Sequence, residues 1–192
     1  MSIVLACKKD GVIYLASDTR DIFGEKKVSR LSPSTYKIVP LEGGLILSLA
    51  GERKTEDVIK AYSEIFTLND EGKLTKEHIV KKIVPELIGA LKEQEVYETP
   101  EDDLPYMKAQ IMLVHEGELF EICSNFMVIK YESFLAIGHS SHALGAILNM
   151  EEYETPNECL ISALDITATY NQDVMRPYVL IDTSKKTFSI VR

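Results

Sequence analysis

The order of the expected elements limits most strongly how this chain can fold. Short apolar runs rich in β-branched residues occur in groups, and two pairs of stretches with helical apolar spacing separate these groups. Runs of strands between runs of helices favour an α+β arrangement over βαβ winding. We therefore expect an α+β protein built as a four-layer αββα sandwich, in which two antiparallel sheets lie between helix pairs.

The strands are expected mainly as hairpins. Residues 2–8 and 12–17 are too short for typical helices and flank the turn-forming pair Asp10–Gly11. Further strands are expected at 36–39, 45–49, 108–115, 118–124, 126–131, 134–137, 178–182 and 187–191. The polar segments 21–34 and 98–105 are interpreted as loops, the first with room for a strand near 27–31.

Four segments carry apolar residues at helical spacing. They are residues 55–68, 76–95, 142–150 and 157–170. Thr75 is a suitable N-cap for the second, and Pro156 suits the first turn of the last. No tract of low complexity and no linker interrupts this order, so residues 1–192 are interpreted as one domain.

Composition excludes several functional classes. The chain has 192 residues and a formal net charge of −9, which disfavours binding to nucleic acid or to an anionic membrane. No apolar run approaches the ~18 residues of a membrane span, and the first residues do not resemble a secretory signal. Three cysteines without CxxC spacing indicate buried thiols in a reducing compartment, at Cys7, Cys123 and Cys159. We expect a cytoplasmic protein.

The beginning of the chain carries a distinctive pattern. It combines Ser2-Ile3-Val4 with the turn Asp10-Gly11 and with Ala16-Ser17-Asp18-Thr19-Arg20, and Asp18 follows Ser2 by 16 residues. This pattern resembles the β-type proteasome subunits and the peptidase of the HslUV system, which are N-terminal-nucleophile hydrolases. Further matches are Tyr36-Lys37-Ile38, Leu47-Ser48-Leu49-Ala50-Gly51 and the segment 136–144, and the expected element order agrees over nearly the whole chain.

The resemblance implies a nucleophile at Ser2 once Met1 is removed. A serine hydroxyl is a weak nucleophile until a base accepts its proton, and the free α-amine of a terminal serine is such a base. Its reference pKa of about 7.7–8.0 lies near working pH. The resemblance gives Lys37 the role of a nearby positive charge, Asp18 that of its partner, and the backbone amide of Ser48 that of the oxyanion donor.

Other positions follow from the same resemblance. The family has a serine at this helix entry that supports the terminal amine, and the best match places His139 there with Ser140 adjacent. A helix N-cap would explain Ser140 or Ser141 equally well. The resemblance places an orienting aspartate at the end of the next helix, where this chain has Thr169 with Asn171 and Asp173 nearby. Supporting and substrate-binding positions are also implied, at Arg20, Asp21 and Ala50.

A metal site is not expected. His139 and His142 have ligand spacing on a helix, but the sequence offers no third ligand. No cofactor is implied. The expected function is hydrolysis of peptide or protein amide bonds, with peptide or unfolded protein as substrate, in a homo-oligomeric ring that an ATP-dependent unfoldase could serve. Two alternatives remain open, a peptide ligase or transamidase on the same site and a non-catalytic scaffold.

Overall fold

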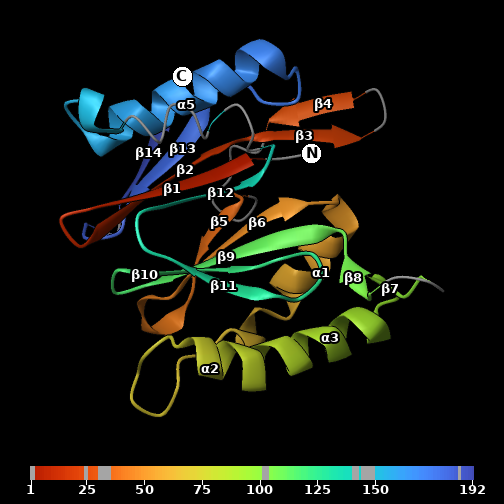
Figure 1. Cartoon of the computed structure of the whole chain (residues 1–192). Helices are drawn as coiled ribbons and strands as arrows, with labels where there is room; N and C mark the ends of the chain where they lie inside the picture. Colours follow the sequence, from red (N-terminus) through yellow and green to blue (C-terminus); the bar gives the residue numbers. More distant parts are fainter. Residues whose placement is uncertain are drawn as a thin grey trace. The chain divides into compact units, whose positions relative to one another are not determined.

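A computed structural model describes residues 3–23, 26–29, 36–100, 104–139, 143, 150–185 and 187–192. These residues form two compact units (Figure 1). The first unit combines residues 1–39 with residues 132–192, and the second comprises residues 40–131. The boundary falls within strand β5 (Ile38–Pro40).

The first unit contains a five-stranded antiparallel sheet in the order β12-β1-β2-β13-β14. Its strands are β1 (Ile3–Lys9), β2 (Val12–Asp18), β12 (Phe134–Gly138), β13 (Tyr178–Asp182) and β14 (Thr187–Val191). The predicted first hairpin is confirmed, and Val4 pairs with Ser17 in its register. Asp10 and Gly11 both have positive φ, at 52° and 79°, which suits a two-residue hairpin turn.

One face of this sheet is covered by helix α5 (Pro156–Tyr170), drawn in blue in Figure 1. Its first turn is stabilised by a capping box, in which the side chains and backbone amides of Thr155 and Glu158 bond reciprocally. Leu160, Ala163 and Leu164 are buried with Ile3 and Leu5 of β1 in one apolar cluster. Burial of this apolar stripe fixes the helix on β1 and β2.

The predicted loop 21–34 is partly wrong. Arg20–Phe23 and Lys26–Ser29 form an antiparallel hairpin of two short strands, β3 and β4. The polar composition of this segment hid the pairing, because backbone hydrogen bonds rather than apolar alternation define these strands. The remaining residues of the predicted loop lie outside the described part of the chain.

The second unit carries the other antiparallel sheet, in the order β11-β10-β9-β6-β5. Besides β5, its strands are β6 (Ile46–Gly51), β9 (Ala109–His115), β10 (Glu118–Ile122) and β11 (Val128–Tyr131). The short 3-10 helix η2 (Glu42–Gly44) precedes β6, and strands β7 (Tyr97–Glu98) and β8 (Tyr106–Met107) form a separate pair. This pair flanks the predicted loop 98–105.

The helices of the second unit differ in detail from the prediction. The helix expected at 55–68 ends early, as α1 (Arg53–Ala61) and the 3-10 turn η3 (Ser63–Ile65). The helix expected at 76–95 is continuous but irregular. It comprises α2 (Lys76–His78), the π-helical segment η4 (Ile79–Ile83) and α3 (Val84–Glu93).

A proline, Pro85, lies just after the π-helical segment. Proline has no backbone N–H and cannot donate to the carbonyl four residues earlier, here that of Lys81. The amide of Val84 donates to the carbonyl of Ile79, five residues back. Thr75 caps this helix as predicted, since its side chain accepts from the amide of His78.

The predicted fold class is confirmed as α+β with two antiparallel sheets. The helix expected at 142–150 lies almost wholly outside the described residues, and the 3-10 helix η5 (Met150–Glu152) follows it. No helix in the described ranges is long and apolar enough to cross a membrane. Cys7 and Cys159 are buried and Cys123 is half-buried, and all three are free thiols.

Candidate active site

The carboxylate of Asp18 is the centre of a buried polar cluster in the first unit. Asp18 is the last residue of β2 and is completely buried. Its Oδ1 accepts from the backbone amide of Ile3 at 3.0 Å, and its Oδ2 accepts from the backbone amide of Arg20 at 3.0 Å. The carboxylate therefore ties the beginning of β1 to the junction of β2 and β3.

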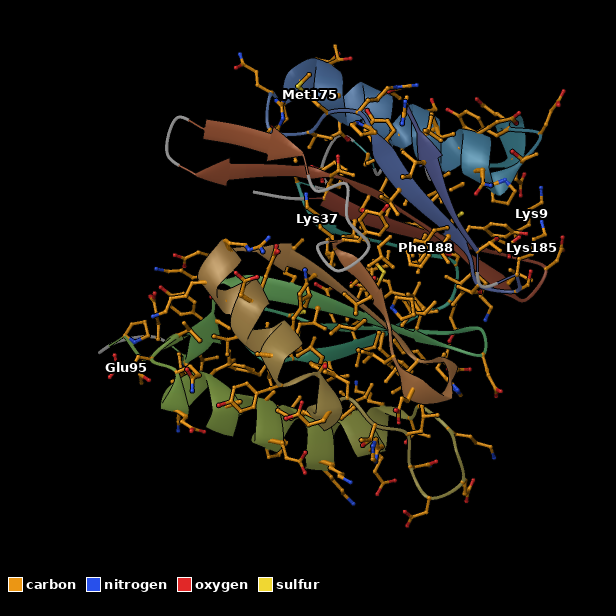
Figure 2. The ribbon with its side chains drawn as sticks, turned by 180° about the vertical axis from the view of Figure 1, so that it is seen from behind. Lys9, Lys37, Glu95, Met175, Lys185 and Phe188 are labelled. Atoms are coloured by element: carbon orange, nitrogen blue, oxygen red, sulfur yellow. The ribbon has the colours of Figure 1, made fainter. Side chains whose placement is uncertain are left out.

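Lys37 donates the third hydrogen bond to this carboxylate. Its Nζ lies 2.6 Å from Asp18 Oδ1, and neither side chain is exposed to solvent. Lys37 directly precedes β5 and is labelled in Figure 2. A buried ammonium group is costly unless it is paired and hydrogen-bonded, so the Asp18 carboxylate is what makes this position possible for lysine.

Arg20 extends the cluster towards the segment after α5. Its guanidinium Nη1 donates to the backbone carbonyl of Gln172 at 2.8 Å. The hydroxyl of Thr19 donates to the carbonyl of Pro177 at 2.9 Å. These two bonds hold the residues on either side of the β2–β3 junction against the segment that joins α5 to β13.

His139 also lies in this region; the resemblance places it where the family has the serine that supports the terminal amine, and its spacing to His142 was the reason to weigh a metal site. His139 directly follows β12, whose last residue, Gly138, pairs with Ile3. Its Nε2 lies 4.0 Å from Asp173 Oδ2, and its side chain is 23% exposed. Burial lowers the pKa of the imidazole. The register of β12 against β1 places His139 here, and that register is not readable from a single sequence.

The remaining predicted residues of the first unit are placed as follows. Ser2, Ser140 and Ser141 lie outside the described residues. Asp21 lies in β3, and its side chain is outside the description. Thr169 is exposed on α5, and its hydroxyl donates to the carbonyl of Asp165 one turn earlier. Thr169 is therefore turned to its own helix.

Ser48 and Ala50 belong to β6 in the second unit, and both are buried. Ser48 pairs in register with Met112 of β9, and β6 has a neighbouring strand on each side. The hydroxyl of Ser48 has no hydrogen-bond partner among the described residues. The role of its backbone amide as an oxyanion donor stays a prediction, as do the roles of all the predicted site residues.

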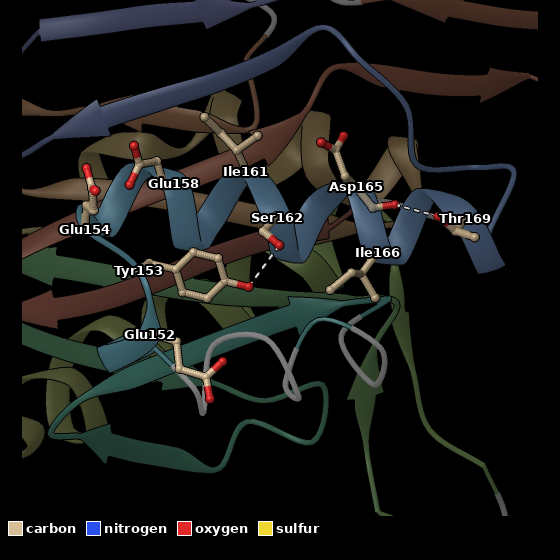
Figure 3. A pocket seen from close by; sticks show the side chains of 9 residues that line it. All are labelled: Glu152, Tyr153, Glu154, Glu158, Ile161, Ser162, Asp165, Ile166 and Thr169. Carbon is tan, nitrogen blue, oxygen red and sulfur yellow. Dashed lines mark hydrogen bonds between the residues drawn. The ribbon is translucent and has the colours of Figure 1, made fainter.

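A depression of the first unit lies elsewhere, along α5 (Figure 3). It has a volume of about 580 Å³ and is lined by side chains of residues 152–169, among them Tyr153, Ser162 and Ile166. The hydroxyls of Tyr153 and Ser162 are 2.9 Å apart. Among the described residues, Thr169 is the one predicted site residue that lines it, and neither Asp18 nor Lys37 does.

The described residues hold no group of three His, Cys, Asp or Glu side chains arranged to bind a metal ion. His142, the partner considered for His139 in the sequence, lies outside these residues. The cluster itself offers the ion pair of Asp18 with Lys37 and the backbone amide of Ile3 that Asp18 holds at the start of β1.

Comparison with known proteins identifies the fold. No family model matches the sequence, and no curated protein matches it significantly. Among solved structures, BPH from Thiobacillus denitrificans is 22% identical, with a TM-score of 0.73, over 99% of this chain and 98% of that chain. The structure of BPH in complex with epoxomicin matches with a TM-score of 0.72 at 20% identity, over 99% of both chains.

Two other proteins share the fold. Eukaryotic HslV from Trypanosoma brucei is 14% identical, with a TM-score of 0.64, over 94% of this chain and 98% of that chain. The helical assembly of the Anbu complex from Pseudomonas aeruginosa gives 15% identity and a TM-score of 0.64, over 94% of this chain and 80% of that chain. The chain thus has the proteasome-like fold of these BPH, HslV and Anbu structures.

Proposed function

We propose that this protein is an N-terminal serine hydrolase that cleaves peptide or protein amide bonds through an acyl-enzyme on Ser2. The observation that carries the proposal is the buried Asp18 carboxylate, which binds both Lys37 and the backbone amide of Ile3. Ile3 is covalently joined to Ser2, so Asp18 anchors the residue next to the proposed nucleophile. The proteasome-like fold supports the same reaction class.

The proposed reaction begins after Met1 is removed. The α-amine of Ser2 accepts the hydroxyl proton while Oγ attacks the carbonyl carbon, and the backbone amide of Ser48 donates to the oxyanion. Collapse of the intermediate breaks the C–N bond, and the ammonium returns its proton to the leaving amine. Water then attacks the ester, with the amine again acting as base, and releases the acid and the free serine.

Lys37 has an electrostatic role in this scheme. Its charge, kept in the protein interior by Asp18, stabilises the negative charge that develops on the serine oxygen. Asp21 and Ala50 are proposed to contact the substrate, and an acidic wall at Asp21 would favour basic side chains before the cleaved bond. Ser140 and Ser141 are proposed near the terminal amine, and Arg20 supports the site through its bond to Gln172.

We propose a cytoplasmic homo-oligomer that acts on unfolded protein delivered by an ATP-dependent unfoldase. The helical assembly described for Anbu supports association of copies of this fold.

Intact mass and active-site labelling test the proposal together. The purified protein is expected to lack Met1 and to react with epoxomicin, the ligand of BPH in one matched structure. Ser2→Ala should lower labelling and peptide cleavage by about 10³-fold or more, because the nucleophile is lost. Ser189→Ala on the exposed strand β14 is the matched control and should leave both unchanged.

The outcomes separate the candidate functions. Retention of Met1 with no labelling would contradict the proposal and favour a scaffold. Labelling at Ser2 followed by transfer of the acyl group to an added amine, faster than to water, would identify a transamidase instead. Cleavage of peptides that remains unchanged in Ser2→Ala would exclude an acyl-enzyme on this residue.

A further inference from the structure

Strand β14 is an open edge of the first sheet. It comes last in the strand order, and its neighbour among the described residues is β13 (Figure 1). The five pairs between Thr187–Val191 and β13 follow one another without a bulge. Alternate backbone N–H and C=O groups of an edge strand point away from its neighbour, where they can pair with another chain. The backbone of β14 is therefore a template for a further strand.

The side chains of β14 are exposed as well. Residues 187–190 are all exposed, and Val191 is half-buried. A strand covered on one face would bury every second residue, because successive side chains point to opposite faces of a sheet. The two large apolar side chains, Phe188 and Ile190, are 38% and 45% exposed. An added strand would thus find both the edge of β14 and its apolar side chains accessible.

The other edge strands of the two large sheets have protection that β14 lacks. Strand β5 contains Pro40, which cannot donate to a ladder, and β11 carries the exposed Lys130. Every second residue of β12 is buried. Thr187–Val191 contains neither proline nor a charged residue. Natural proteins normally block their edge strands against pairing, so an unblocked one indicates a surface that a partner covers.

A pocket lies at the end of β14. It has a volume of about 490 Å³ and is lined by Arg176, Pro177, Ile190 and Arg192. Arg176 donates to the carbonyl of Arg192 at 2.9 Å, and its other nitrogens bond to the carboxylate of Asp165. The side chain of Arg192 has no hydrogen bond or ion pair among the described residues. The pocket therefore combines an apolar wall with one uncompensated guanidinium group.

The charges at the two ends of β14 restrict which partner can pair with it. Residues 185–192 include Lys185, Lys186 and Arg192 but no acidic residue, although the whole chain has a net charge of −9. Lys185 contacts Asp182, yet its side chain is 73% exposed. Two copies of β14 in antiparallel pairing would bring the Lys185 end of each strand to the Arg192 end of the other. Like charges placed opposite each other are destabilising, so this edge favours an acidic strand over a second copy of itself.

We propose that β14 and the pocket at its end bind an extended segment of another protein, with alternating apolar residues between carboxylates. The segment adds to the sheet as a sixth strand. One of its carboxylates contacts the guanidinium of Arg192, and an apolar side chain enters the pocket beside Ile190. Backbone hydrogen bonds supply the affinity, while the pocket and the charge supply the selectivity. This binding does not depend on the reaction proposed for Ser2.

Peptide binding to the full-length protein tests the charge requirement. In fluorescence anisotropy at low salt, the labelled peptide DETVTVTVED should bind, and KKTVTVTVKK should bind at least 10-fold more weakly. Arg192→Glu should weaken binding of the acidic peptide at least 10-fold, because a charge-assisted hydrogen bond is replaced by repulsion. Lys82→Glu, a charge reversal at an exposed position of the second unit, is the matched control and should bind as the wild type does. Equal binding by Arg192→Glu and the wild type would overturn the inference.

Methylated peptides test the strand pairing without any change to the protein. The acidic peptide is made in two forms, each N-methylated at alternate central residues. Only one form keeps the N–H groups that face β14, so one should bind as the parent does and the other at least 10-fold more weakly. The parent peptide should also slow hydrogen exchange at the outward amides of β14. If both methylated forms bind equally well, the segment does not add as a strand.

Two further results would contradict the proposal. Equal affinity for the acidic and basic peptides, or no binding of either, would exclude selection of an acidic segment. Analytical ultracentrifugation tests whether a second copy covers the edge. An oligomer that Ile190→Glu dissociates, in a protein that does not bind the acidic peptide, would assign β14 to self-association. Circular dichroism should confirm that the variants are folded.

Discussion

At the scale of single residues, one carboxylate organises the candidate site. Asp18 accepts from Ile3, Arg20 and Lys37, so a buried charge is fully hydrogen-bonded rather than merely neutralised. Its partner Lys37 is the second largest of the fully buried side chains among the described residues. Such a pair contributes little net stability compared with apolar packing, but the loss of one partner leaves an uncompensated charge.

Substitution of one partner should therefore cost more than substitution of both. Asp18→Asn should lower the free energy of unfolding by about 3–5 kcal/mol, because the ammonium of Lys37 loses its counter-charge. Asp18→Asn combined with Lys37→Met should regain part of this loss. Urea unfolding followed by circular dichroism measures both values. If Asp18→Asn unfolds at the same urea midpoint as the wild type, the Asp18 carboxylate does not stabilise the buried ammonium of Lys37.

At the scale of elements, what alanine costs at a glycine depends on its surroundings: close backbone approach decides it in the β6–β9 sheet, and helix propensity decides it on the open face of α3. At the end of β6, a Cβ on Gly51 would lie 2.3 Å from the carbonyl oxygen of Lys108 and 2.5 Å from the Cα of Ala109. Gly51 pairs with Ala109 in the β6–β9 register, so the sheet itself leaves no room for a side chain. Gly89 in α3 is the opposite case, with no atom within 4 Å of a Cβ.

Alanine should therefore act in opposite directions at these two glycines. Gly51→Ala should destabilise the protein by about 1–3 kcal/mol or more, since backbone atoms of β9 must move. Gly89→Ala should stabilise it by about 0.5–1 kcal/mol, because glycine is unfavourable inside a helix. Thermal and urea unfolding measure both changes. Equal shifts of the same sign would contradict the account of the β6–β9 contact.

At the scale of the whole molecule, the first unit is built from two separate stretches of the chain, residues 1–39 and 132–192. Its sheet combines strands from both ends of the sequence, while residues 40–131 form the second unit. The single domain expected for residues 1–192 stays a prediction. It implies that both units unfold in one cooperative transition, since small single domains usually do.

The three thiols report on this cooperativity. Burial raises the pKa of Cys7 to about 12 and that of Cys123 to about 11, so at pH 8 only about one Cys123 thiol in a thousand is ionised. All three cysteines should react slowly with a thiol reagent in the folded protein and rapidly once unfolded. Pulse labelling along a urea series, read by peptide mass spectrometry, should give one midpoint for Cys7, Cys159 and Cys123. A separate midpoint for Cys123 would show two independent domains.

Much of the fold could be predicted because its elements have strong local signals. The Asp10–Gly11 hairpin and the stripe of α5 follow from turn chemistry and apolar periodicity. A strand near 27–31 was foreseen and overlaps β4, but its pairing with β3 was missed because the segment lacks apolar alternation. The π-helical segment was missed because it differs from an α-helix in its hydrogen bonds rather than in its apolar spacing. The early end of α1 was also missed, since helix boundaries depend on packing as well as on periodicity.

The sequence by itself determined the α+β class, because turns and periodicity are properties of neighbouring residues, and its resemblance to the β-type proteasome subunits singled out Asp18 and Lys37. Only the tertiary structure decided that the Asp18 carboxylate binds both Lys37 and Ile3, and that His139 and Asp173 lie together at the same sheet end. These contacts join residues 15 to 34 positions apart. They arise from strand register and from the turn after α5, which packing of the whole unit sets.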